Sequence, residues 1–310
     1  MKLAMIFPGQ GSQYVGMGKD LYENFGYVRE LFDQSNDILG FDLKKMCFEG
    51  PEEALKMTSH TQPAILTMST ACWMVLRERG ITPAAVAGHS LGEYSALVAA
   101  GAISFADALR LVHKRGMFMQ ESAPAGGMAA ILGLAPDLVR QACTEASESG
   151  TVEVANYNCP GQIVIAGEKG ALEKAMELCR GLGAKRALPL QVSGPFHSSL
   201  MTEAGKKLAA ELDKINFSQP SCPLVANVTA DEAQTTLGIK ELLVKQISSS
   251  VRWEESVQKL TSIGVNVYIE VGPGKVLCGL GKKIIKDAQF FNIEDASGLE
   301  NILANLKEVI

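Results

Sequence analysis

Ser90 is the side chain in this sequence best placed to act as a nucleophile. It lies at the centre of the G-x-S-x-G motif Gly88-His89-Ser90-Leu91-Gly92. Between a strand and a helix, this motif forms a sharp turn that exposes the serine hydroxyl above the N-terminus of the helix. The partial positive charge of that helix end favours a developing anion. Because the motif also occurs by chance, its meaning depends on the partners that the rest of the chain supplies.

A nucleophilic serine needs a general base, and the sequence offers four histidines. His60 precedes a predicted helix and lies near no other motif, and His113 lies on a helix, one face away from the expected site. His89 adjoins the serine, but a residue flanking the nucleophile is expected to point away from it. His197 lies in a loop over residues 194–199, where the chain returns to the large domain described below. We therefore predict that His197 is the base.

Two N–H groups are needed to stabilise the oxyanion of an acyl-transfer intermediate. In an elbow of this type, one belongs to the residue after the nucleophile, which is Leu91 here. The other comes from a second loop at the end of a strand. The first predicted strand ends in the glycine-rich loop Pro8-Gly9-Gln10-Gly11-Ser12-Gln13. The simplest assignment of the second N–H is therefore Gln10.

Arg115 is a candidate for substrate binding. It lies on a helix predicted over residues 107–120, which directly follows the helix of the elbow. An arginine in this place can reach the site and bind a carboxylate through two parallel hydrogen bonds. An ordinary ester hydrolase has no need of such a group. The alternative is that Arg115 lies on a solvated helix face.

The elements around these residues predict a mostly parallel sheet covered by helices. Apolar runs over residues 3–7, 84–87, 224–228 and 265–271 are typical of buried strands, and helical patterns lie between them. The glycine-rich loop, the elbow and a turn at Gly272 all follow predicted strands. Ligands on such sheets bind at the carboxyl ends of the strands, so the three loops are expected to meet at one site.

Residues 126–193 differ in character from the rest. Strands predicted over 128–134, 152–155, 162–166 and 186–192, with helices from 136 and over 169–181, give the order β-α-β-β-α-β. This is the ferredoxin-like pattern. We predict that it forms a small α+β subdomain over residues 126–193, inserted into a catalytic domain made of residues 1–125 and 194–310.

The composition excludes several classes of function. The chain has 310 residues and a net charge of −5, which argues against nucleic-acid binding. The start is too short for a signal peptide, and no apolar run is long enough to span a bilayer. The seven cysteines include no C-x-x-C pair, so neither a metal site nor a disulfide framework is predicted. We expect a cytoplasmic protein with no membrane partner.

Six short motifs, in order along the chain, give the sequence a specific resemblance. It resembles the malonyl-CoA:acyl carrier protein transacylases, the acyltransferase family of type II fatty-acid synthesis, over essentially its whole length. The motifs are Phe7-Pro8-Gly9-Gln10-Gly11-Ser12-Gln13, Gly88-His89-Ser90-Leu91-Gly92-Glu93, Arg115-Gly116 with Met119-Gln120, Asn158 with Pro160-Gly161-Gln162, Gly194-Pro195-Phe196-His197, and Glu270-Val271-Gly272-Pro273-Gly274.

The resemblance implies a fold and a set of roles. The fold is an α/β-hydrolase-like core with an inserted ferredoxin-like subdomain. Ser90 carries the acyl group, His197 is the base, and Arg115 holds the free malonyl carboxylate. The base is oriented by a backbone carbonyl, which matches Gln246, whereas no acid stands out between the serine and the histidine as in a hydrolase. Glu270 and Asp231 remain alternative orienting groups.

Further residues match the family near its substrate. They are Asn158, Phe196, Met119 and His89, with Asn156 beside them. A phenylalanine before the catalytic histidine resembles the malonyl-preferring form, whereas methylmalonyl-selective relatives usually have serine there.

The resemblance also implies the reactants. Malonyl-CoA is the donor, and the acceptor is the phosphopantetheine thiol of an acyl carrier protein, with no cofactor of the enzyme itself. Acyl carrier proteins are acidic, so a local basic patch is expected. Candidates for that patch are Lys185, Arg186, Lys275, Lys282, Lys283 and Lys286.

Three alternative functions remain. One is an acyltransferase that serves a polyketide synthase, and another is a serine thioesterase or esterase on the same scaffold. The third is a non-catalytic member of a synthase complex. The presence of Arg115 and the missing acid argue against the hydrolase, and the set of Ser90, His197 and Arg115 argues against the non-catalytic member.

Overall fold

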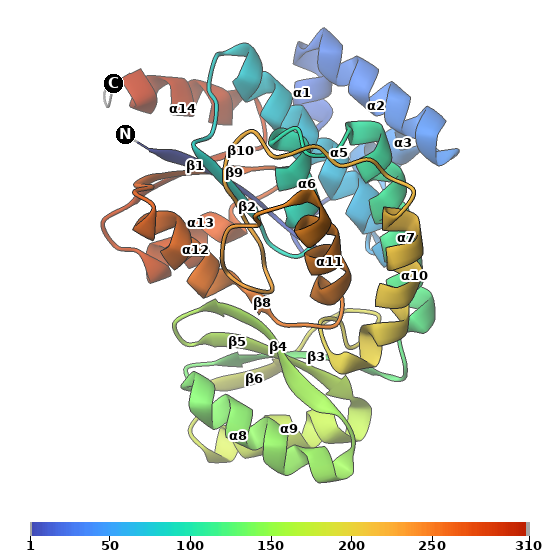
Figure 1. The fold of residues 1–310 in the computed structure, drawn as a ribbon, viewed down its shortest axis with the longest axis vertical. Helices are drawn as coiled ribbons and strands as arrows, with labels where there is room; N and C mark the ends of the chain where they lie inside the picture. Colours follow the sequence, from blue (N-terminus) through green and yellow to red (C-terminus); the bar gives the residue numbers. More distant parts are fainter. Residues whose placement is uncertain (1, 308–310) are drawn as a thin grey trace.

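A five-stranded parallel sheet forms the centre of the larger part of the molecule. The computed structural model describes residues 2–307 and is shown in Figure 1. The strands run in the order β10-β9-β1-β2-β7, and every neighbouring pair is parallel. Their bounds are β1 Leu3–Phe7, β2 Ala85–Gly88, β7 Leu224–Val225, β9 Val267–Val271 and β10 Gln289–Ile293.

Both faces of this sheet are covered, which explains why its strands are continuous apolar runs. Side chains of β1 alternate between two cores. Ala4 and Ile6 pack with α12 and α13, whereas Met5 and Phe7 pack in the core that contains α5, α6 and α7. The predicted fold class, with a mostly parallel sheet and a second small sheet, is confirmed.

Within residues 2–307, twelve α-helices accompany the parallel sheet, and α5 is buried along most of its length. Their bounds are α1 Lys19–Asn24, α2 Gly26–Leu39, α3 Leu43–Glu49, α4 Glu52–Leu55, α5 Thr58–Glu78, α6 Gly92–Ala99, α7 Phe105–Ser122, α10 Thr202–Leu212, α11 Thr236–Gln246, α12 Trp253–Ser262, α13 Val276–Ile284 and α14 Ala296–Lys307. None of the helices between residues 2 and 307 has the length and apolarity that a membrane crossing requires.

Helix α5 begins at Thr58, although His60 was expected to precede it, and a neighbouring side chain makes up for the internal Pro63. A proline in the second turn has no N–H for the carbonyl four residues earlier, which is that of Ser59. The Nδ1 atom of His113 on α7 lies 3.0 Å from this carbonyl oxygen and donates the missing hydrogen bond. His113 therefore stabilises the contact between α5 and α7. Gly116 on α7 permits the close approach of the two helices, since a Cβ there would lie 2.6 Å from the Thr58 carbonyl oxygen.

The second sheet contains the predicted β-α-β-β-α-β order. Its antiparallel strands run β6-β3-β5-β4, and α8 and α9 cover its outer face (Figure 1). These elements have a core of their own. Their bounds are β3 Gly126–Leu132, α8 Pro136–Ala146, β4 Val152–Cys159, β5 Gln162–Glu168, α9 Lys169–Gly181 and β6 Arg186–Pro189, and short 3₁₀ helices span Ser147–Ser149 and Ser199–Met201.

A strand from the C-terminal part of the chain extends this second sheet. Strand β8, Val251–Arg252, pairs parallel with β4, with Asn156 opposite Val251. No strand was predicted at these residues. The pairing joins the two parts of the molecule directly behind the predicted site.

Some boundaries differ from the sequence expectations. β6 ends at Pro189 rather than 192, and β7 has two residues rather than five. β7 stops early because the chain turns at Ala230, which has a φ of 52°, and Asn227 reaches instead toward the elbow. α13, β10 and α14 were not predicted.

Candidate active site

The G-x-S-x-G segment forms the predicted elbow between β2 and α6. Ser90 has a φ of 51°, a left-handed conformation that is costly for a residue with a side chain. The glycines permit the turn. A Cβ at Gly88 would lie 1.9 Å from the Gly92 carbonyl carbon, and one at Gly92 would lie 1.9 Å from the Phe7 carbonyl oxygen. Both positions of the motif are therefore restricted to glycine by β1 and by the turn itself.

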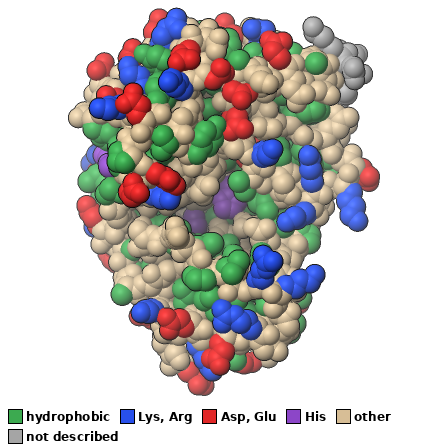
Figure 2. Space-filling model, turned by 180° about the vertical axis from the view of Figure 1, so that it is seen from behind, with side chains coloured by type: hydrophobic (Ala, Val, Ile, Leu, Met, Phe, Trp, Pro, Cys, Tyr) green, Lys and Arg blue, Asp and Glu red, His purple; other side chains and the backbone are tan. Residues whose placement is uncertain are grey.

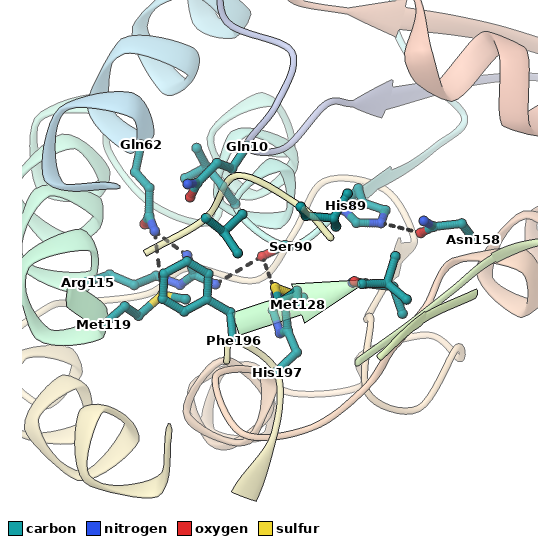
Figure 3. A pocket seen from close by; sticks show the side chains of 15 residues that line it. Gln10, Gln62, His89, Ser90, Arg115, Met119, Met128, Asn158, Phe196 and His197 are labelled. Carbon is teal, nitrogen blue, oxygen red and sulfur yellow. Dashed lines mark hydrogen bonds between the residues drawn. The ribbon is translucent and has the colours of Figure 1, made fainter. Parts of the chain in front are cut away.

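His197 faces the nucleophile at hydrogen-bond distance. Its Nε2 lies 2.7 Å from Ser90 Oγ (Figure 3). Its Nδ1 lies 2.8 Å from the backbone carbonyl oxygen of Gln246. Since a carbonyl only accepts, Nδ1 carries the proton and Nε2 is left free to accept from the serine hydroxyl. His197 also has a positive φ, of 60°. The chain thus holds both members of the pair in strained conformations.

Burial, and after it the nearby charge of Arg115, lower the pKa of His197 to about 3. The imidazole is consequently neutral over the physiological range. A neutral imidazole with a bare Nε2 is the form that a general base requires.

Arg115 is buried beside the serine rather than on a solvated face, with 1% of its surface exposed. Its Nη2 donates to Ser90 Oγ at 3.2 Å and to Gln246 Oε1 at 2.9 Å, and its Nη1 donates to Gln62 Oε1 at 2.9 Å. All three acceptors are uncharged. Within residues 2–307, no carboxylate forms an ion pair with this guanidinium. A buried cation without a counter-ion in direct contact is suited to bind an anion.

The predicted oxyanion donors are available. The N–H of Ser90 is occupied, because it donates to Asn227 Oδ1 at 2.7 Å. In the part of the chain that is described, the N–H groups of Gln10 and Leu91 make no backbone hydrogen bond outside helices and strands. Leu91 is also the N-cap of α6, so its N–H lies at the positive end of that helix.

These residues surround a cavity of about 170 Å³. All the predicted site residues line it except Gln246, which lies behind the serine. The lining is Gln10, Gln62, His89, Ser90, Leu91, Arg115, Met119, Met128, Asn156, Asn158, Val164, Leu190, Val192, Phe196 and His197.

A second cavity of about 570 Å³ adjoins the first and shares walls with it at Gln10, His89 and Asn158. It is lined by the glycine-rich loop, by residues 190–192 and by the start of α13. Figure 2 shows histidine side chains at the bottom of a hollow between the two halves of the molecule. The nucleophile is therefore reached through a passage between the parallel sheet and the second sheet.

His89 contacts Asn158 rather than the nucleophile and lies where a substrate-binding residue was expected. It lines both cavities, and its Nε2 lies 2.9 Å from Asn158 Oδ1. Burial lowers the pKa of His89, so it is neutral and donates this bond. Neither alternative acid orients the base. Glu270 accepts from the N–H groups of Leu277 and Cys278 at the start of α13, and the exposed Asp231 pairs with Lys259 at 2.8 Å.

Comparison with known proteins agrees with this geometry. Over residues 4–300 the sequence matches the family described as acyl transferase domain. The chain belongs to this acyl transferase family. It is 49% identical to the malonyl CoA-acyl carrier protein transacylase of Bacillus subtilis, over 99% of this chain and 98% of that protein. It is 50% identical to the protein of the same name from Escherichia coli, over 92% and 93%.

Solved structures of acyl transferases have the same fold. A malonyl CoA-acyl carrier protein transacylase from Clostridium perfringens superposes with a TM-score of 0.96 at 44% identity, over 100% of this chain and 98% of that chain. A malonyl-transacylase solved in complex with a type II PKS acyl-carrier protein gives a TM-score of 0.96 at 46% identity, over 98% of this chain and all of that chain.

Sequence reasoning missed three polar residues that support this acyl transferase site. Asn227 bridges the elbow, because its Oδ1 accepts from the Ser90 N–H and its Nδ2 donates to the Gly88 carbonyl at 2.6 Å. Gln62 holds Arg115, and Glu93 lies buried one turn after the serine. A signal existed only for Glu93, which is the single charged residue in an otherwise small and apolar helix segment.

Proposed function

We propose that this acyl transferase moves a malonyl group from malonyl-CoA to the phosphopantetheine thiol of an acyl carrier protein through a malonyl-serine intermediate. The observation that carries the proposal is the position of Arg115. A buried guanidinium that contacts the nucleophile, and that no carboxylate pairs within residues 2–307, is suited to an acyl group with a free carboxylate. A hydrolase of simple esters would gain nothing from it.

In the first half-reaction, Ser90 Oγ attacks the thioester carbonyl while its proton passes to His197 Nε2. The N–H groups of Gln10 and Leu91 donate to the oxyanion of the tetrahedral intermediate. When the intermediate collapses, the carbon–sulfur bond breaks and the CoA sulfur takes the proton from Nε2. The products are malonyl-Ser90 and CoA, and the imidazole is neutral again.

In the second half-reaction, the thiol of the carrier's phosphopantetheine gives its proton to Nε2 and attacks the serine ester. The same N–H groups stabilise the oxyanion. The carbon–oxygen bond to Ser90 then breaks, and Oγ recovers the proton from His197. Malonyl leaves as a thioester of the carrier, so the enzyme consumes no cofactor in either half.

The backbone carbonyl of Gln246 has the role that an acid has in many serine enzymes. It accepts from His197 Nδ1 at 2.8 Å, which fixes the tautomer and the plane of the ring. A neutral carbonyl stabilises an imidazolium less than a carboxylate does. The nearby positive charge of Arg115 also disfavours the imidazolium.

The remaining predicted substrate contacts divide between the two cavities. Met119 and Phe196 line the inner cavity, where they would shape the space for the acyl group. His89 and Asn158 lie at its junction with the outer cavity, where a pantetheine chain would enter. CoA and the carrier arm share this chain, so one passage would serve both half-reactions.

The carrier protein is expected to dock beside the outer cavity. All six basic candidates are exposed, and Lys275 directly precedes the helix α13, whose first turns line that cavity. Figure 2 shows lysine and arginine side chains gathered along one side of the hollow. This position favours an acidic partner. We also propose a cytoplasmic location. The catalytic domain comprises residues 1–125 and 194–310, and the inserted subdomain comprises residues 126–193.

Transfer to a carrier tests the function. The enzyme is incubated with malonyl-CoA and a bacterial acyl carrier protein in its holo form, and the carrier is analysed by mass spectrometry. We expect malonyl on the holo carrier and none on the apo carrier. Release of free malonate with an unmodified carrier would favour a thioesterase. A carrier of fatty-acid synthesis and one of a polyketide synthase, compared side by side, distinguish the two pathways.

A further inference from the structure

Glu93 is a buried carboxylate that the proposed reaction does not use. It lies on α6, three residues after the nucleophile, and is 1% exposed. Its Oε2 accepts from the backbone N–H of Asn227 at 3.0 Å and from Gln246 Nε2 at 2.9 Å. Burial raises its pKa to about 7. Burial of a carboxylate costs free energy, so the hydrogen bonds of Glu93 are expected to have a function.

The contacts of Glu93 lead to the side-chain amide of Gln246. One hydrogen of Nε2 goes to Glu93, and the other goes to the Ser90 carbonyl oxygen at 3.0 Å. The amide oxygen Oε1 accepts from Arg115 Nη2 at 2.9 Å. A carboxylate and a carbonyl accept only, whereas a guanidinium donates only. The amide therefore has one orientation that satisfies all three neighbours.

Removal of the acceptor at Glu93 would leave one N–H of Gln246 with only a longer contact to Asn227 Oδ1, at 3.5 Å. The amide would then be held less firmly and could turn. A turned amide would place its NH₂ group against the guanidinium, where donor faces donor. Arg115 would keep Gln62 but lose its second glutamine acceptor. His197 is unaffected by this rotation, because it is held by the backbone carbonyl of Gln246 and not by the amide.

We propose that Glu93 is a positioning residue for Arg115: as a hydrogen-bond acceptor, it fixes the amide of Gln246, and the amide holds the guanidinium that binds the acyl carboxylate. The inference rests on the proposed role of Arg115. It predicts a residue that determines acyl selectivity without touching the acyl group. Gln246 then has two separate tasks, since its carbonyl serves the base and its amide serves the cation.

Two substitutions separate the acceptor from the charge. Glu93→Met keeps the size and the helix propensity but removes the acceptor. Glu93→Gln removes the charge but can still accept both hydrogen bonds through its amide oxygen, because both now go to the single atom Oε2. Ser95→Ala is the control, since Ser95 is buried on the same helix and its hydroxyl has no hydrogen-bond partner among the described residues.

The experiment measures kcat/KM for malonyl-CoA and for acetyl-CoA with a holo carrier, together with the melting temperature of each full-length variant. We expect Glu93→Met to lower malonyl transfer by about tenfold or more and acetyl transfer by less than about threefold. We expect Glu93→Gln and Ser95→Ala to keep the malonyl-to-acetyl ratio within about threefold of the wild type.

An unchanged ratio of malonyl to acetyl transfer in Glu93→Met would overturn the inference. If Glu93→Gln lost as much malonyl transfer as Glu93→Met, the effect would come from the charge, and this would overturn the inference too. Arg115→Ala in the same assay distinguishes the two proposals, because a ratio that it leaves unchanged contradicts the proposed function itself. If Glu93→Met does not fold, Gln246→Met takes its place. It removes the amide and keeps the carbonyl, so selective loss of malonyl transfer supports the inference and equal loss of both acyl groups contradicts it.

Discussion

The guanidinium of Arg115 donates a hydrogen bond to the nucleophile itself, with Nη2 at 3.2 Å from Oγ of Ser90. The cation is therefore next to the atom that becomes acylated. In a malonyl group, the carboxylate is two bonds from the reacting carbonyl. The carboxylate can therefore reach the guanidinium while the carbonyl oxygen reaches the oxyanion donors. Selection of the acyl group and nucleophilic attack thus occur within one small cavity.

Loss of this cation should change which acyl group is transferred. For Arg115→Ala we expect malonyl transfer to fall by about 100-fold or more, while acetyl transfer is retained or improved, because only malonyl carries the second carboxylate. The measurement is kcat/KM for both donors. Arg110→Ala is the matched control, since Arg110 lies on the same helix with a side chain that is 55% exposed. Equal losses for both donors would disprove the role of Arg115 as carboxylate ligand.

The size of the acyl group should depend on Phe196. Its ring is 4% exposed and lines the inner cavity. For Phe196→Ser we expect the ratio of methylmalonyl to malonyl transfer to rise by about tenfold, because the vacated volume admits the extra methyl group. Competition between the two CoA esters, read by mass spectrometry, measures this ratio. A fall in both activities at constant ratio would show that the ring does not limit acyl size.

The turn of the elbow should fail when its second glycine gains a side chain. For Gly92→Ala we expect a loss of about 1–3 kcal/mol in the free energy of unfolding, because its Cβ would meet the Phe7 carbonyl oxygen. Gly279→Ala on α13 is the control. A Cβ there meets nothing within 4 Å, so we expect a gain of about 0.5–1 kcal/mol from helix propensity. Urea denaturation measures both, and a neutral Gly92→Ala would contradict the packing.

The buried imidazole of His197 should make the protein less stable in acid. Its pKa is about 3 in the folded chain, against an ordinary value of 6.5. Below pH 6.5 the unfolded state binds the proton and the folded state does not, so stability falls as the pH drops from 6.5 toward 3. Between pH 6 and 4, the free energy of unfolding should fall more steeply for the wild type than for His197→Gln, by at most about 1.4 kcal/mol per pH unit. Parallel slopes would mean that His197 is protonated in the folded protein.

The hydrogen bond from His113 to the Ser59 carbonyl should stabilise the protein only because Pro63 lacks an N–H. For His113→Phe we expect a loss of about 1–3 kcal/mol in the free energy of unfolding, since the Ser59 carbonyl is left without its donor. In a Pro63→Ala background the new backbone N–H can take over, so the same substitution should cost less. A double-mutant cycle measures the difference. Equal losses in both backgrounds would show that the two positions are independent.

Local patterns predicted most of the elements, because most of the buried parallel strands and the elbow are determined by residues close in sequence. The parallel strand β10 and the helices α13 and α14 were not predicted. The family resemblance and the fold class are confirmed, and the structure brings the predicted site residues together around Ser90. Their catalytic roles stay predictions. The buried position of Arg115 could not be derived from its helix alone, since burial depends on how α7 packs against α5.

The polar side chains that support the elbow could not be predicted from the sequence, because their contacts also depend on tertiary packing. Asn227 and Gln246 contact the elbow from more than 130 positions away. Only the three-dimensional fold shows that they do. Strand β8 was missed because its two residues gain strand geometry from pairing with β4, which no local pattern records.

Intact-protein mass spectrometry after incubation with malonyl-CoA, without a carrier, tests the central claim most directly. The account predicts one malonyl group per chain, located on Ser90 by peptide mapping, absent from Ser90→Ala, and removed when a thiol acceptor is added. A malonyl group on another residue, or one that persists in Ser90→Ala, would contradict it.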